Sequence, residues 1–237
     1  MVDQMPPDWQ EPAHYAALQS ADARQWAWEF LRRNPAYRRD WEAFIARWRA
    51  LEADYGAPPQ RDFLRWKADP RAWVRAAEAE GGECRVDEDK VLIECALGAK
   101  YGFYKFPPDP VEDRPDIEWR PLPETPPFED CAEVEAAMPL CFDLALPLRP
   151  QLEAAGRRLA ARQARLRREG MRMKRLRVWR DEWLRWLRLL DAEAAGAGEE
   201  AIARVLFGGD RQALADARRA AHALRDGGYR EIAFYPE

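Results

Sequence analysis

A tryptophan-rich stretch near the N-terminus constrains the fold more than any other feature of the chain. Between residues 22 and 55, apolar side chains recur every three or four positions, which is the spacing of one buried helix face. Asp22 suits a helix N-cap, with Gln25 three residues later. Asn34 and Pro35 then interrupt the pattern, because a residue before proline avoids the helical conformation. The pattern predicts two aromatic-rich helices that meet at an Asn34–Pro35 corner.

The last third of the chain predicts further helices with one apolar side each. A helix that begins near Pro150 and is interrupted at Gly170 carries Leu152, Ala155, Leu159 and Leu166 on one side. The next one carries Leu176, Trp179, Trp183, Trp186, Leu187, Leu190 and Ala194. Two shorter helices flank Gly208–Gly209. The stretch AGAGEEAIARVLFGG, residues 195–209, is therefore either the leading part of a helix-turn-helix or one arm of an ordinary helical hairpin.

The middle of the chain is less regular. We expect a helix over residues 62–79 and another over 87–101 that ends at Gly102, although Val91, Ile93 and Cys95 alternate as a strand would. Prolines then become too dense for regular structure.

Two short strands, at 117–120 and 140–146, could pair as a small hairpin within this region. The sequence thus predicts a mainly α protein in three parts. They are a helical N-terminal domain at 1–56, an irregular Pro-rich middle at 57–148, and basic helices with a helix-turn-helix-like bundle at 149–237.

Composition excludes several classes of protein. No stretch approaches the roughly 18 apolar residues of a membrane span, and the N-terminus has no apolar segment behind a basic start. The four cysteines are widely spaced without a CxxC pair, and the two histidines stand far from them in the sequence. We therefore expect a cytoplasmic protein with reduced cysteines, no metal and no membrane partner.

Motifs of catalysis are also missing from the sequence. No glycine-rich phosphate loop follows an expected strand, and neither Gly-x-Ser-x-Gly nor His-Glu-x-x-His occurs. Two isolated histidines offer little material for proton transfer at neutral pH. We expect no enzymatic activity, no catalytic residue and no cofactor.

Charge is distributed very unevenly. The chain has a net charge of −4, yet residues 149–188 contain fourteen Lys/Arg and four Asp/Glu, a local charge of +10. Such a segment is typical of a surface that neutralises phosphates, although it could also be the solvated face of a helix. Five side chains in its second half are the candidate phosphate contacts: Lys174, Arg177, Arg180, Arg185 and Arg188.

A helix-turn-helix would insert the helix after Gly209 into the major groove of DNA. The candidate base contacts on that helix are Arg211, Gln212, Arg218 and Arg219. Acidic residues oppose this interpretation, because they repel phosphate and dilute the basic side chains: Glu199, Glu200, Asp210, Asp216 and Asp226. A helical hairpin with solvated arginines is the alternative.

Two parts of the sequence resemble known families. DWQEPAHYAALQSADARQWAWEFLRRNPAYRRDW, YGFYKFPPDP and Trp119-Arg120-Pro121 resemble the transcriptional-regulator-like domain of proteobacterial proteins. LRLLDAEAAGAGEEAIARVLFG and ARRAAHALRDGGYREI are similar to a helix-turn-helix-like module associated with integrative conjugative elements, whose relatives are transcription activators or anti-activators. Similar sequences often have a Tyr-Arg pair where this chain has Glu199 and Glu200, which weakens DNA contact by that short helix.

These observations predict a DNA-associated transcriptional regulator of a mobile or conjugative element, with double-stranded DNA as its partner. The alternative is an anti-activator that sequesters a regulator protein without binding DNA itself. Its distinguishing feature would be an acidic face, including Glu199, Glu200 and Asp216, that meets a basic partner.

Overall fold

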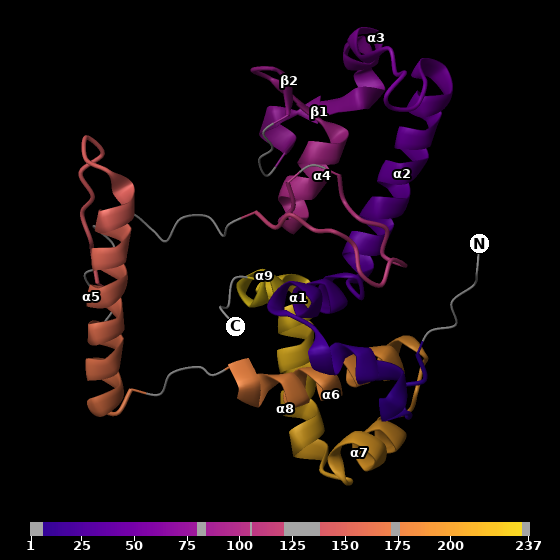
Figure 1. Ribbon diagram of the computed structural model, residues 1–237. Coiled ribbons are helices and arrows are strands. Elements are labelled where there is room, and N and C mark those ends of the chain that lie inside the picture. Colours follow the sequence, from indigo (N-terminus) through magenta and orange to yellow (C-terminus); the bar gives the residue numbers. More distant parts are fainter. Residues whose placement is uncertain (1–6, 80–83, 105, 121–137, 172–175, 234–237) are drawn as a thin grey trace. The chain divides into compact units, whose positions relative to one another are not determined.

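The computed structural model describes residues 7–79, 84–104, 106–120, 138–171 and 176–233, and it describes only the backbone of 176–179. Two compact units are distinguished, one made of Met1–Leu122 with Arg177–Glu237 and the other of Pro123–Leu176. Helices dominate both, beside one small sheet (Figure 1), so the mainly α expectation is confirmed. The predicted boundaries at residues 56 and 148 stay predictions.

The first unit begins with the predicted helical corner. A 3₁₀-helix, η1 (Pro12–Ser20), leads into α1 (Ala23–Leu31) and α2 (Pro35–Tyr55). The Asp22 carboxylate accepts a bond from the Gln25 amide at 2.7 Å and so caps α1. The Asn34 side-chain oxygen accepts from the amides of the two residues after Pro35, at 2.7 and 3.1 Å. Both helix starts agree with the sequence.

The next segment differs from the two helices expected there. α3 (Phe63–Ala68) is short, and η2 (Pro70–Ala72), β1 (Trp73–Arg75) and η3 (Ala76–Glu78) follow it. The single helix over 62–79 was therefore wrong. Asp69 precedes Pro70 and adopts an extended conformation, which ends α3.

A three-stranded antiparallel sheet occupies the start of the second expected helix. β2 (Arg85–Asp87) and β1 both pair with β3 (Lys90–Leu92), giving the order β1-β3-β2. α4 (Ile93–Tyr101) starts only after β3 and ends at Gly102, as expected. The helix over 87–101 was thus wrong in its first part, because cross-strand pairing buries Val91 and Leu92 in place of a helical turn.

Side chains of this region form an aromatic core against α2. Its buried members are Phe44, Trp48, Leu51, Trp66, Ala72, Leu92 and Ile93. The Trp48 and Trp66 rings meet edge to face at 4.7 Å, and the Arg61 guanidinium lies 3.5 Å from the Trp66 ring centre. Trp48 and Trp66 therefore serve as core residues.

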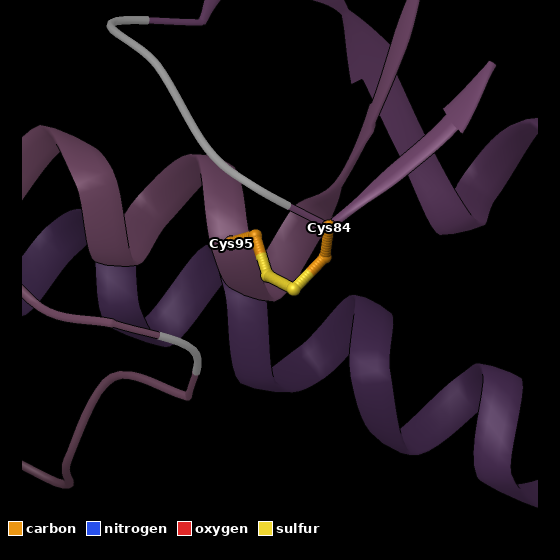
Figure 2. The surroundings of a disulfide bond; sticks show 2 residues. All are labelled: Cys84 and Cys95. Carbon is orange, nitrogen blue, oxygen red and sulfur yellow. A yellow bond between two sulfur atoms is a disulfide. The ribbon is translucent and has the colours of Figure 1, made fainter. Parts of the chain in front are cut away.

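The cysteines differ from the expected reduced state. Cys84 and Cys95 form a disulfide, with their Cα atoms 5.9 Å apart (Figure 2). The β2–β3 hairpin brings the residue before β2 to the first turns of α4, a proximity that the 11-residue spacing alone does not reveal. Cys141 is free and exposed, and Cys131 lies outside the described residues.

The expected hairpin of residues 117–120 and 140–146 is wrong for the described residues. Phe103 and Trp119 form an isolated antiparallel bridge, and residues 138–147 contain no strand. The first segment pairs with the chain just after α4 instead, through bonds from the Tyr104 amide to the Glu118 carbonyl and from the Arg120 amide to the Gly102 carbonyl. In the second segment the Asp143 carboxylate accepts from the Ala145 amide, which forms a local turn in place of a strand.

The C-terminal helices complete the first unit. They are α6 (Leu176–Ala194), α7 (Glu199–Phe207), α8 (Arg211–Ala223), a π-helical turn η5 (Leu224–Gly228) and α9 (Tyr229–Ile232). α1 packs against α9 and η5, and the Trp26 and Trp183 rings lie 5.7 Å apart. The two ends of the sequence therefore share one core.

In the second unit, α5 (Leu148–Arg168) is the main described element (Figure 1). The side chain of Gln151 bonds back to the segment before the helix, donating to the carbonyl of Asp143 at 2.9 Å. Gly170, at φ +94°, follows the helix, so the predicted interruption is confirmed.

Candidate nucleic-acid interface

α7 and α8 are joined by a turn of the length found in helix-turn-helix motifs. The turn is Gly208-Gly209-Asp210, and both glycines have positive φ. The Asp210 carboxylate caps α8 by accepting from two backbone amides at 2.9 Å. Buried Ile202, Leu206 and Leu214 lie on the inner sides of the pair. The local geometry is compatible with both predicted interpretations, a helix-turn-helix and an ordinary helical hairpin.

The predicted base contacts on α8 bond to acidic side chains. Arg211 pairs with Glu200 at 2.8 Å, and Arg219 pairs with Asp216. Gln212 also donates to Asp216, at 3.2 Å. These three residues are exposed, but each already has a carboxylate as its partner.

Arg218, the fourth candidate, is only partly exposed. Its Nε lies 2.7 Å from Glu193 on α6, and its Nη1 lies 3.6 Å from Glu199 on α7. The same Glu193 carboxylate meets Nε2 of His222 at 2.7 Å. Arg218 and Glu193 therefore link α6 to α8 within the unit.

Local charge around this motif is balanced. Residues 199–226 contain five arginines and five acidic residues. Four of these arginines would first have to exchange a carboxylate for a phosphate to contact DNA: Arg211, Arg218, Arg219 and Arg225. Arg204 on α7 is exposed and has no ion-pair partner among the described residues. The acidic residues of the same stretch indicate in the sequence that its arginines can be paired. Their spacing does not show which acid pairs with which arginine.

The predicted phosphate contacts on α6 are only partly available to DNA. Arg188 donates to the carbonyls of Trp9 and Gln10, at 2.8 and 2.9 Å. Arg185 is exposed, and its guanidinium lies 5.8 Å from the Phe207 ring centre. Arg180 is half-buried and has a partner of its own. Lys174 and the side chain of Arg177 lie outside the described residues.

α5 presents arginines that the residue-level prediction did not single out. Its 21 residues include seven arginines and one glutamate. Arg149 pairs with Glu153 at 3.3 Å, and Arg165 pairs with Glu169 at 3.1 Å. Within the described ranges, Arg157, Arg158 and Arg168 are exposed and have no ion-pair partner. The sequence signal was present, because α5 lies inside the basic segment 149–188.

A buried ionic cluster holds the N-terminal helices to α6. Arg33 bonds to Asp191 through two nitrogens and to Glu29 at 2.6 Å, and the Tyr15 hydroxyl donates to Asp191 at 2.7 Å. Burial alone would lower the pKa of Arg33, but Asp191 and Glu29 raise it above its ordinary value. Burial and Asp191 likewise raise the pKa of Tyr15. The charge of Arg33 is thus fixed inside the unit.

Asn34 makes a second link across the unit. Its side-chain nitrogen donates to the carbonyl of Arg225 at 3.0 Å, while its oxygen caps α2. The motif Arg32-Arg33-Asn34-Pro35 is therefore a structural joint. Sequence reasoning found the cap but not the long-range partners.

The described residues contain neither a metal-binding cluster nor a membrane-spanning helix. No group of three or more His, Cys, Asp or Glu side chains there could hold a metal ion. No helix in the described ranges is both long and apolar enough to cross a membrane.

The N-terminal part of the chain is similar to a known family. Residues 8–89 match the family model of the proteobacterial transcriptional regulator-like domain, which supports a regulatory role. The matched range runs from the segment before η1 to the turn between β2 and β3. No curated protein and no solved structure matches the chain. The C-terminal module lies outside the matched range and stays a prediction.

Proposed function

We propose that this chain is a DNA-associated transcriptional regulator in which residues 149–188 supply contacts to the phosphates of double-stranded DNA. The domain match at residues 8–89 supports regulation. The similarity of the C-terminal sequence to modules of conjugative elements suggests a mobile element as the regulated system. The proposal assigns no catalytic step and no cofactor.

The observation that carries this proposal is the arginine surface of α5. Arg157, Arg158 and Arg168 can approach phosphates without giving up an ion pair within the described residues. Arginine suits this role because its charge is permanent and its planar fork matches phosphate oxygens. The arginines of α8 are less suited, since each would exchange one anionic partner for another.

Such contacts would be largely independent of base sequence. Phosphate contacts fix the position and orientation of a protein on DNA, whereas base edges carry the sequence information. Under this proposal α5 supplies affinity, and any discrimination among sites comes from α8 or from another element. The two contributions can be separated by experiment because they lie on different helices.

The test is a titration of the full-length protein against duplex DNA at several salt concentrations. Three phosphate contacts would give a slope of about −2.7 for the logarithm of the association constant against the logarithm of salt, at about 0.9 per contact. Additional phosphate contacts from α6 would make this slope steeper. A flat response, or no binding at low salt, would contradict the proposal.

The anti-activator alternative is favoured by one feature, the acidic start of α7. The side chains of Glu199 and Glu200 are 58% and 85% exposed. Carboxylates at a helix N-terminus are stabilised by the helix dipole and would repel DNA phosphates. A basic regulator protein would fit this surface better than DNA. Under this function, Glu199→Lys with Glu200→Lys would abolish binding of that regulator.

A further inference from the structure

The disulfide joins a short edge strand to a buried helix. Cys84 directly precedes β2, and Cys95 lies in the first turn of α4 (Figure 2). β2 has three residues and lies at one edge of the sheet, and its pairing with β3 is irregular between Arg85 and Asp87. Both of these residues are exposed, and Val86 packs against the core. The disulfide is therefore a major anchor of β2.

The other bonds of the β2–β3 hairpin are local or weak. The Lys90 amine pairs with the Asp87 carboxylate at 2.7 Å, within the hairpin itself. The Leu92 amide donates to the Cys84 carbonyl at 3.0 Å, so it joins the end of β3 to the residue before β2. A pair of short strands is only marginally stable in water without further packing. Without the disulfide, β2 should therefore open far more often than the neighbouring helices.

The core of this region does not depend on the disulfide. Its buried members come from α2, α3, η2, β3 and α4, and neither cysteine is among them. The Cys84 side chain only borders this core. β3 also pairs with β1 over three residues, on the side away from β2. Reduction should therefore leave α2, α4 and β3 in place and loosen β2 alone.

The two cysteines differ in their access to solvent. Cys84 is partly exposed, whereas Cys95 is only 4% exposed. Thiol–disulfide exchange begins when a thiolate approaches one sulfur of the bond, and accessible disulfides are the labile ones. A thiolate from solution therefore attacks Cys84, and Cys95 is the leaving group.

We propose that Cys84 and Cys95 form a reversible thiol–disulfide switch that holds β2 to α4 when oxidised and releases β2 when reduced. The reductant is a small thiol of the glutathione class. Its thiolate bonds to the Cys84 sulfur and breaks the bond between the two cysteines, and the Cys95 thiolate that leaves takes up a proton. A second small thiol then forms a disulfide with the first and releases Cys84, which also takes up a proton. Two electrons thus pass to the protein, and the disulfide of the small thiol reverses both steps.

The switch acts on the regulator-like domain. The matched range, residues 8–89, contains Cys84 and β2 but ends before Cys95. Reduction would therefore loosen the last strand of that domain. The two cysteines lie in the first unit and α5 in the second, so the inference does not rest on the phosphate contacts proposed for α5.

Redox equilibration of the full-length protein tests whether the bond is reversible. Protein that starts either oxidised or reduced is held in glutathione buffers with several ratios of thiol to disulfide. An alkylating reagent then quenches exchange, and mass spectrometry maps the two cysteines. Both starting forms should converge on the same fraction of disulfide at each ratio. A bond that resists excess glutathione in the folded protein, or that glutathione disulfide fails to restore, would overturn the proposal.

Single variants test the order of attack. Glutathione disulfide should form an adduct with Cys84 in Cys95→Ala at least about threefold faster than with Cys95 in Cys84→Ala, because the more accessible sulfur reacts first. Mass spectrometry of the adducts measures both rates. Faster reaction at Cys95 would contradict the attack assigned to Cys84.

Hydrogen–deuterium exchange tests the effect on β2. Reduction should speed exchange of the amides in residues 84–89 by about tenfold and change those of α2 and α4 by less than about twofold, because β2 opens locally. Cys84→Ala/Cys95→Ala should resemble the reduced protein with and without reductant. The control, Cys141→Ala, should keep the full response to reductant, since Cys141 is free and exposed.

Two results of the exchange experiment would overturn the switch. Equal acceleration in β2, α2 and α4 would show that the bond braces the whole region. Unchanged exchange of residues 84–89 on reduction would show that β2 is held without it. The reduced unmodified protein provides both measurements even where the double variant fails to fold.

Discussion

Arg33 and Asp191 stand 158 residues apart in the sequence and form a two-point ion pair, with Nε–Oδ1 at 2.7 Å and Nη2–Oδ2 at 2.8 Å. The Arg33 side chain is only 7% exposed, so its charge depends on this partner and on Glu29. The pair connects the corner between α1 and α2 to α6. It joins the N-terminal and C-terminal helices within one compact unit.

Removing Asp191 should therefore be strongly destabilising. Asp191→Ala leaves the Arg33 charge buried with less compensation, and we expect a loss of about 3–5 kcal/mol in the free energy of unfolding. Chemical denaturation measures this loss in the free energy of unfolding. The control is Glu153→Gln, which breaks an exposed pair with Arg149 and should cost less than about 0.5 kcal/mol. A loss below 1 kcal/mol for Asp191→Ala would contradict the role given to this pair.

Asn34 should matter more than a simple helix cap does. Asn34→Ala removes both the cap of α2, worth about 1 kcal/mol, and the bond to the Arg225 carbonyl, worth about 1–2 kcal/mol when buried. Asn34→Ser keeps a capping oxygen but no amide donor, so it should lose about half as much. Equal losses in denaturation experiments would assign the whole effect to the bond with the Arg225 carbonyl, and no loss for Asn34→Ser would assign it to the cap alone and contradict the second link.

The disulfide should add measurable stability. Cys84 and Cys95 close a loop of 11 residues, which corresponds to about 2–3 kcal/mol in the loop-entropy account. Reductant should lower the denaturation midpoint of the protein and leave that of Cys95→Ser unchanged. Cys141→Ser serves as the control, because Cys141 is exposed and free. An unchanged midpoint of the unmodified protein under reductant would show that the bond contributes nothing.

The paired arginines of α8 allow a test of whether that helix faces DNA. Glu200→Gln/Asp216→Asn frees Arg211 and Arg219 from their carboxylates and removes two negative charges. If α8 lies on DNA, affinity for duplex DNA should rise several-fold, and the salt slope should steepen by about 0.9 per new phosphate contact. Glu11→Gln/Glu78→Gln removes the same charge from exposed positions elsewhere. No difference between the two variants would place α8 away from DNA.

Sequence alone predicted those parts of the fold that depend on local signals. The Asp22 and Asn34 caps, the proline after Asn34 and the glycine after α4 each act within a few residues, and each was found in its expected role. The small sheet was missed because pairing with distant strands, rather than local periodicity, decides the conformation of Val91 and Leu92.

In the candidate DNA interface, too, the sequence predicts the local features and folding decides the long-range contacts. The excess of arginine in residues 149–188 can be counted in the sequence. Which arginine stays unpaired depends on neighbours brought together by folding, such as Glu193 beside Arg218 or the Trp9 carbonyl beside Arg188. Spacing along one helix cannot reveal those contacts.

The central claim, that α5 contacts DNA phosphates, is tested most directly by comparing salt slopes of two variants with equal charge. Arg157→Gln/Arg168→Gln removes two unpaired arginines of α5, and Arg24→Gln/Arg49→Gln removes two exposed arginines of α1 and α2. Each lost phosphate contact should lower the slope by about 0.9, so the α5 variant should lose about 1.8 and the control close to zero. Equal slopes for the two variants would contradict the account.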